Sequence, residues 1–138
     1  MFLVTLLVTG IFLFLSGIHV FWAFGNNQNS SAVIPTRDSE PLFKPSTATT
    51  LLVAFALLMA AIIVLIQTEI LNLPIPDWIG NIGIWVLVAV FGLRAIGDFR
   101  YVGFFKRVRG TKFAQMDTRI YSPLCVFIAV MTALIALT

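Results

Sequence analysis

Charged and reactive residues are scarce in this sequence. Only 11% of its 138 residues are Asp, Glu, Lys or Arg, and it has one histidine and one cysteine. A soluble domain is typically about one quarter charged. A single cysteine cannot form an intramolecular disulfide, and one histidine without a cysteine beside it lacks the spacing of a metal site. We therefore expect no disulfide framework, no metal and no cofactor.

What the chain has instead is long apolar stretches, at residues 2–24, 47–67, 78–99 and 120–137. About 20 helical residues cross a hydrocarbon core roughly 30 Å thick. The sequence therefore predicts an all-α integral membrane protein, with residues 1–138 forming a single transmembrane domain. The first stretch has no basic residue before it and exceeds the apolar core of a signal peptide, so we expect a retained helix. The predicted bundle has four transmembrane helices, at about 2–24, 47–67, 78–99 and 118–137.

The start of the fourth helix depends on Pro123. A helix that began at this proline would have 16 residues and a length of about 24 Å, which is short for a membrane span. We therefore place its start near Thr118 and predict a kink at Pro123.

The basic residues predict the orientation of the bundle. The N-terminus, the 68–77 connection and the C-terminus have no Lys or Arg. Basic residues near helix ends stay on the cytoplasmic side. We therefore predict both termini outside, two long cytoplasmic connections (25–46 and 100–119), and a multi-pass protein of the bacterial cytoplasmic membrane. The basic residues of the two connections are Arg37, Lys44, Arg100, Lys106, Arg107, Arg109, Lys112 and Arg119.

An advance of 100° per residue gives each of the first three predicted helices one face of small or polar residues. Small residues let helices approach closely in a membrane, and hydroxyl groups form hydrogen bonds between them. These faces are therefore expected to form the bundle interface. In the first helix the face contains Thr5, Thr9, Ser16 and His19, and in the third it contains Gly80, Gly83, Val90, Arg94, Gly97 and Asp98.

Several ionisable and aromatic side chains are expected at a similar depth near the cytoplasmic side. Ionisable residues within spans are costly and often functional. Arg94 and Asp98 are four residues apart, a spacing at which helical neighbours touch. We predict that six residues converge on one cytoplasm-facing cavity: His19, Trp22, Arg94, Asp98, Asp117 and Tyr121. The residues predicted to meet lipid headgroups are Arg100, Lys106, Arg107, Arg109 and Lys112.

Each of these residues also has a structural interpretation. Arg94 and Asp98 could form only an intrahelical ion pair that reaches the headgroups, and His19 could only bond a hydroxyl on a neighbouring helix. Trp22 could be an interface anchor, and Asp117 could cap the fourth helix or pair with a basic neighbour.

The same residues carry a resemblance to a known family. The segments Gly17–Gly25, Val33–Pro35, Leu93–Lys106, Phe113–Asp117 and Tyr121–Leu124 resemble a domain-of-unknown-function family, number 3995, of small bacterial membrane proteins. The resemblance covers nearly the whole chain. It implies a four-helix bacterial membrane protein and no particular activity. The matching positions include His19, Trp22, Pro35, Arg94, Gly97, Asp98, Asp117 and Tyr121.

Three functions are compatible with the sequence. The favoured one is binding of a small amphiphile or an anionic lipid headgroup, with Arg94 pairing the anion and Asp98 holding the guanidinium. An alternative is a small intramembrane enzyme that uses His19 as general acid or base. A third is a membrane partner subunit or immunity-type protein. The expected partners are membrane lipids, a small amphiphilic ligand, and a membrane-protein partner or a second copy of the chain, and not nucleic acid.

Overall fold

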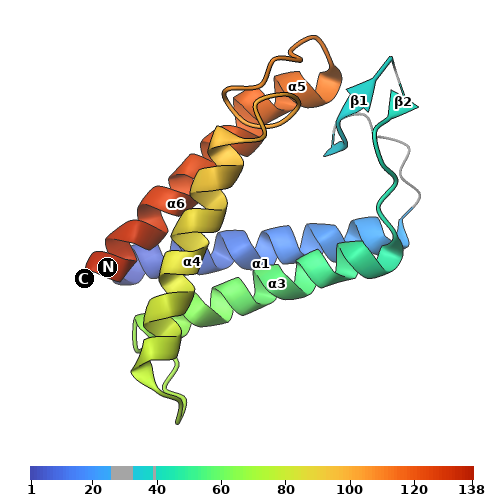
Figure 1. The fold of residues 1–138 in the computed structure, drawn as a ribbon. Coiled ribbons are helices and arrows are strands. Elements are labelled where there is room, and N and C mark those ends of the chain that lie inside the picture. The colour runs from blue at the N-terminus through green and yellow to red at the C-terminus, as the bar shows by residue number, and fades with distance from the viewer. Residues whose placement is uncertain (26–32, 39) are drawn as a thin grey trace.

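The computed structural model describes residues 1–25, 33–38 and 40–138. Residues 26–32 and 39, in the first connection, lie outside this description. The long helices are α1 (Phe2–Phe24), α3 (Thr47–Gln67), α4 (Asp77–Ile96) and α6 (Ser122–Leu137) (Figure 1). A short helix, α5 (Lys112–Met116), and a π-helical turn, η1 (Asp117–Tyr121), lead directly into α6. Two short antiparallel strands, β1 (Thr36–Arg37) and β2 (Glu40–Pro41), lie in the first connection.

The four membrane-spanning helices that the sequence predicts are present. The segments Phe2–Phe24, Thr47–Gln67, Asp77–Ile96 and Lys112–Leu137 are each long and apolar enough to cross a membrane. The first two have the predicted bounds. The third ends at Ile96 instead of residue 99, and the fourth begins at Lys112 instead of residue 118. The structure is thus that of an all-helical, multi-pass membrane protein.

Local chemistry accounts for the helix ends. The Ser46 hydroxyl accepts a hydrogen bond from the Thr49 N–H at 3.1 Å and so caps the start of α3. The Thr111 hydroxyl accepts from the Ala114 N–H at 3.0 Å and caps α5 in the same way. Gly97 has φ +86°, which an α-helix cannot include, and therefore ends α4. The early cap at Thr111 explains why the fourth span begins before its predicted start.

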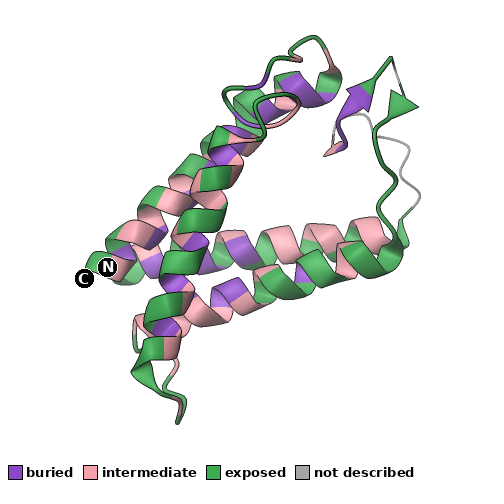
Figure 2. Ribbon diagram, in the orientation of Figure 1, coloured by how far each residue is buried: buried purple, intermediate pink, exposed green. Residues whose placement is uncertain are grey.

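The helices pair as two hairpins, α1 with α3 and α4 with α6, which have the most extensive contacts. The hairpins cross at an apolar core that includes Val8, Phe12, Ile84 and Ile128, all fully buried. The rings of Phe12 and Phe91 lie 5.5 Å apart across this crossing. Figure 2 shows that buried residues gather at the crossing and again beneath the connection that precedes α6.

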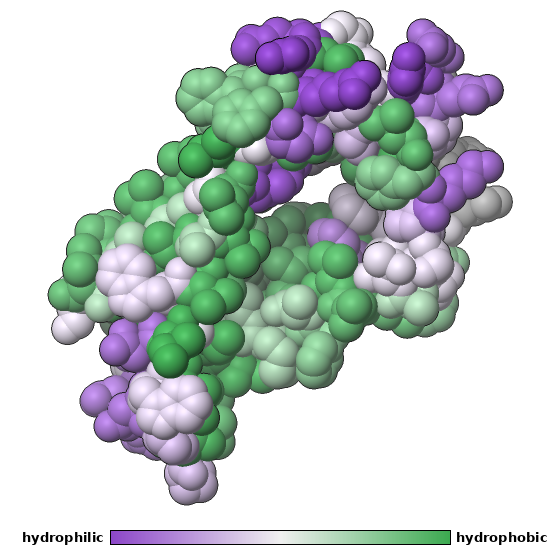
Figure 3. Space-filling model, in the orientation of Figure 1, coloured by the Kyte–Doolittle hydropathy of each residue, from purple (hydrophilic) through white to green (hydrophobic). Residues whose placement is uncertain are grey.

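Beyond the crossing, the two hairpins diverge toward the connections that join α1 to α3 and α4 to α5 (Figure 1). Figure 3 shows open space between the diverging parts of the molecule. We call this space the inter-hairpin opening.

The predicted small and polar faces form helix contacts. Thr5 and Thr9 of α1 are buried, and the Ser16 hydroxyl donates to the Ala54 carbonyl oxygen of α3 at 2.7 Å. A Cβ atom added to Gly83 of α4 would lie 2.9 Å from a side-chain carbon of Ile63 in α3. These residues therefore hold neighbouring helices close together. The predicted face of the third helix is only partly present, since Val90 is exposed and Gly97 and Asp98 lie beyond the end of α4.

Candidate functional site

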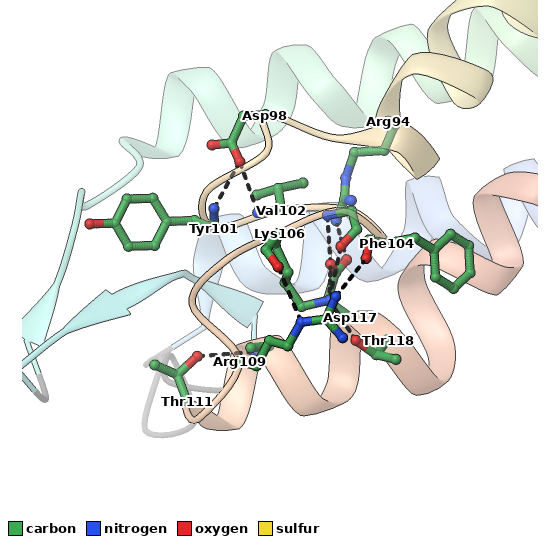
Figure 4. A network of polar contacts seen from close by, with 12 residues as sticks. Arg94, Asp98, Tyr101, Val102, Phe104, Lys106, Arg109, Thr111, Asp117 and Thr118 are labelled. Atoms are coloured by element: carbon green, nitrogen blue, oxygen red, sulfur yellow. Dashed lines mark hydrogen bonds and ion pairs between the residues drawn. The ribbon is translucent and has the colours of Figure 1, made fainter.

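A buried polar cluster centred on Asp117 joins α4, the following connection and η1 (Figure 4). The Asp117 Oδ1 accepts a hydrogen bond from Arg94 Nη2 at 3.0 Å. Its Oδ2 accepts from the Gly103 N–H at 2.7 Å and from Lys106 Nζ at 3.2 Å. The Asp117 side chain is fully buried, whereas the Arg94 side chain keeps 32% of its surface exposed. We call Arg94, Gly103, Lys106, Asp117 and Thr118 the Asp117 cluster.

A tight loop after α4 brings Gly103 to Asp117. Gly97 and Gly103 both have positive φ. A Cβ added to Gly97 would collide with the backbone of residues 102–103, and a Cβ added to Gly103 would collide with the backbone of residues 96–97. The loop closes with a hydrogen bond of 2.9 Å from the Phe104 N–H to the Ala95 carbonyl oxygen. The two glycines therefore allow the backbone to approach itself and direct the Gly103 N–H toward Asp117.

Asp117 also begins the π-helical turn η1. The Ser122 N–H donates to the Asp117 carbonyl oxygen, five residues back, instead of four as in an α-helix. Pro123 follows immediately and has no N–H to donate. The distortion thus lies just before Pro123, where we predicted a kink.

The burial of Lys106 contradicts the prediction that this residue meets lipid headgroups. Its side chain is only 1% exposed. Its ammonium group donates to the Gly103 carbonyl oxygen at 2.9 Å, to Asp117 and to the Thr118 hydroxyl at 2.5 Å. A lysine ammonium has three N–H donors, and each of them has an acceptor here. Lys106 is therefore an internal residue, whereas the other predicted interface residues, Arg100, Arg107, Arg109 and Lys112, are exposed.

The predicted ion pair between Arg94 and Asp98 is wrong. The α4 helix ends at Ile96, so the four-residue spacing no longer places the two side chains on one face. Arg94 pairs with Asp117 instead. The Asp98 Oδ1 accepts hydrogen bonds from the N–H groups of residues 100–102, at 2.8 to 3.0 Å. Burial alone would raise the Asp98 pKa, but these donors outweigh burial and lower that pKa below its usual value.

His19 and Trp22 lie together at the far end of α1. Their rings are 5.1 Å apart in an edge-on arrangement. The His19 Nδ1 lies 2.7 Å from the Leu15 carbonyl oxygen. A carbonyl oxygen only accepts, so the His19 Nδ1 is the donor in this contact. Both residues line a cavity of about 210 Å³ together with Val33, Ile34, Phe43, Pro45, Thr49, Thr50 and Val53.

The six predicted site residues therefore occupy three places. Arg94 and Asp117 lie in the Asp117 cluster, and Tyr121 lies one turn further, with its ring 5.8 Å from that of Phe113. Asp98 lies in the connection, and His19 lies with Trp22. Within residues 1–25, 33–38 and 40–138, neither His19 nor Trp22 forms a hydrogen bond or ion pair with the Asp117 cluster.

Residues 12–132 match the model of a family described as "Protein of unknown function (DUF3995)". The chain belongs to this family. The match confirms the resemblance inferred from the sequence and includes every residue of the Asp117 cluster. No curated protein and no solved structure matches the chain.

Sequence reasoning missed three members of the Asp117 cluster, Gly103, Lys106 and Thr118. Lys106 follows two phenylalanines and precedes Arg107, so its surroundings in the sequence resemble those of an interfacial cation. A usable signal was the spacing of Gly97 and Gly103. Two glycines on either side of a short segment with Asp98 at its start are typical of a closed loop, which turns residues after it back toward the helix.

Replacement of Asp98 tests its loop function. Asp98→Ala should increase hydrogen exchange of the amides of residues 100–102 about fivefold, which corresponds to the loss of roughly 1 kcal/mol of capping. Because the folded-state pKa is lowered, this stabilisation is complete above the unfolded-state pKa and is lost as pH falls through the folded-state pKa. Asp77→Ala, at an exposed carboxylate in the first turn of α4, should leave these amides unchanged. Equal exchange in both variants would contradict the assignment.

Proposed function

We propose that this protein binds an anionic amphiphile in the inter-hairpin opening, with Arg94 pairing the anion. One observation carries the proposal. The Arg94 Nη1 is buried and has no hydrogen-bond partner among the described residues. Its other terminal nitrogen, Nη2, is bound to Asp117. A buried nitrogen without an acceptor is costly, and an anionic ligand oxygen would satisfy it.

The charge of the Asp117 cluster supports an anionic ligand. Arg94 and Lys106 contribute two positive charges, and both pair with the single carboxylate of Asp117. The cluster therefore has an excess positive charge. A charge taken out of water needs a partner, and a carboxylate or phosphate group would neutralise this one.

The helical phase of α4 supports a position of Arg94 at the edge of the inter-hairpin opening. At 100° per residue, Leu87, Phe91 and Arg94 lie within a sector of roughly 60°. Phe91 contacts Phe12 of α1 at the crossing of the hairpins. Arg94 is about one turn further along the same face, where the hairpins diverge. An anion bound at Arg94 would therefore lie at the edge of this opening.

The surface around the opening supports an amphiphile rather than a free ion. Figure 3 shows hydrophilic side chains on the connection at one side of the opening and hydrophobic side chains on the helices at the other. An amphiphile would match both surfaces, with its anion at Arg94 and its apolar part against α1 and α3. The alternative role of His19 as an acid or base has less support, since no carboxylate contacts His19 in the part of the chain that the structure describes.

Arg94→Lys tests the proposal. The lysine keeps a positive charge for Asp117 but lacks a second terminal nitrogen for a ligand. Binding of a dansylated fatty acid is measured by its fluorescence in mild detergent. We expect the affinity to fall about tenfold, because one charge-assisted hydrogen bond is lost.

Arg107→Lys is the matched control, since Arg107 is exposed and lies outside the Asp117 cluster. It should bind the fatty acid as the wild type does. Thermal unfolding of both variants checks that each is folded. A folded Arg94→Lys variant with wild-type affinity would refute the role of Arg94. Lys106 cannot serve as a surface control, because it is buried beside Asp117.

A further inference from the structure

A second feature that could hold a lipid lies on the other side of α4. An apolar groove of about 290 Å³ runs between α4 and α6. Gly92 and Ile96, which line it, lie roughly 160° around the helix from Arg94. The groove is therefore distinct from the inter-hairpin opening. Its lining residues are Gly92, Ala95, Ile96, Phe104, Phe105, Val126, Ala129 and Val130.

Small residues keep this groove open. The two facing helices leave space between them because three of the lining residues are small, namely Gly92, Ala95 and Ala129. A glycine between membrane helices usually permits close contact of their backbones. Gly92 has no such role, since an added Cβ would meet nothing within 4 Å. The space beside Gly92 is therefore available to a ligand that the bilayer supplies, and a flexible acyl chain fits its apolar lining.

A cation lies beside one end of the groove. Phe104 and Phe105, which belong to the connection after α4, line the groove, and Arg109 Nη2 donates to the Phe104 carbonyl oxygen at 3.3 Å (Figure 4). The Arg109 Nε also donates to the Lys106 carbonyl oxygen at 3.2 Å. These two bonds hold the guanidinium next to the phenylalanines while the residue remains exposed.

We infer that this groove binds one acyl chain of an anionic phospholipid, whose phosphate group pairs with Arg109. Charge complementarity favours this occupant over an uncharged lipid. Arg109 is exposed and bonded to the Phe104 carbonyl oxygen, so a positive charge lies beside the groove. A planar guanidinium with several N–H donors suits a phosphate group. The inference is independent of the proposed function, because it uses no side chain of the Asp117 cluster.

Gly92→Leu is the first test, since the leucine has room to extend into the groove. Binding of phosphatidylglycerol to the purified protein in mild detergent is measured by native mass spectrometry. We expect Gly92→Leu to weaken this binding about tenfold, since a branched side chain replaces several methylene groups of the lipid in the groove. Gly10→Leu is the matched control, because Gly10 of α1 is exposed and also has no atom within 4 Å of an added Cβ.

Arg109→Gln tests the headgroup. We expect it to reduce the preference for phosphatidylglycerol over phosphatidylcholine about fivefold, as expected for one interfacial cation, while Arg37→Gln keeps the wild-type preference. Full phosphatidylglycerol binding by Gly92→Leu would overturn the groove assignment. Equal binding of the two lipids by the wild type would overturn the role of charge. Arg94→Lys should bind phosphatidylglycerol normally, so failure of the proposed function leaves this result unaffected.

Discussion

Asp117→Asn should destabilise the protein by about 3–5 kcal/mol, the usual cost of removing one partner from a buried ion pair. The carboxylate is fully buried and accepts hydrogen bonds from Arg94, Gly103 and Lys106. An asparagine has one acceptor oxygen and an NH₂ group that only donates. Its NH₂ group would therefore face another donor, either the guanidinium or the Gly103 N–H, and two cations would remain without a counter-charge.

The free energy of unfolding of Asp117→Asn can be measured by titration with sodium dodecyl sulfate in mixed micelles, followed by circular dichroism. Asp77→Asn is the control, because Asp77 is an exposed carboxylate at the start of α4. It should change this free energy by less than about 0.5 kcal/mol. A similar small change for Asp117→Asn would contradict the structural role of the cluster.

A second substitution separates charge from packing. Asp117→Asn combined with Lys106→Met removes the buried ammonium along with the carboxylate, and methionine fills a similar volume. We expect the double variant to be more stable than Asp117→Asn, since no unpaired charge remains at residue 106. A double variant that is less stable than the single one would show that the hydrogen bonds of Lys106 matter more than its charge.

The membrane helices were predictable because hydrophobicity alone determines them. A span needs a sufficient length of apolar residues, whatever its neighbours are. The bounds of α1 and α3 agree with the apolar stretches for this reason. The end of α4 was not predictable in the same way, since Phe99 follows Asp98 and hydrophobicity does not determine the last helical residue, whereas the positive φ of Gly97 does.

The ion pairs depend on the backbone conformation of the connection after α4, and hydrophobicity does not determine that conformation. The spacing of Arg94 and Asp98 indicates a contact only if the helix continues through both residues. Once the helix ends, Asp98 binds nearby backbone N–H groups, as Asp often does in turns. Asp117 then becomes the partner of Arg94 across 23 positions of the sequence.

The burial of Lys106 could not be predicted from the composition of its connection. Its connection contains several cations among aromatic residues, and the sequence offers no reason to distinguish one of them. Among the described cations of this connection, Lys106 alone reaches Asp117, whereas Arg100, Arg107 and Arg109 are exposed. Tertiary contact therefore separates the buried cation from the interfacial ones.

Gly97→Ala should disrupt the loop that carries Gly103 and Lys106 to Asp117. Gly97 has φ +86°, and its added Cβ would collide with the Val102 carbonyl group. A non-glycine residue in this conformation costs about 1–3 kcal/mol, before any clash. The Gly103 N–H would also lose its bond to Asp117, which leaves a buried acceptor less satisfied at a further cost of about 1–3 kcal/mol. We expect a loss of stability close to that of Asp117→Asn.

Gly110→Ala provides the control for this prediction within the same connection. An added Cβ at Gly110 meets nothing within 4 Å, and its φ is not in the positive range. It should leave unfolding in mixed micelles nearly unchanged, and limited proteolysis should cut the 97–111 connection in Gly97→Ala but not in Gly110→Ala. Gly103→Ala should behave like Gly97→Ala, because its Cβ would collide with the Ile96 carbonyl group. If both variants matched Gly110→Ala in stability, the close approach of the two glycines would not be what positions the Asp117 cluster.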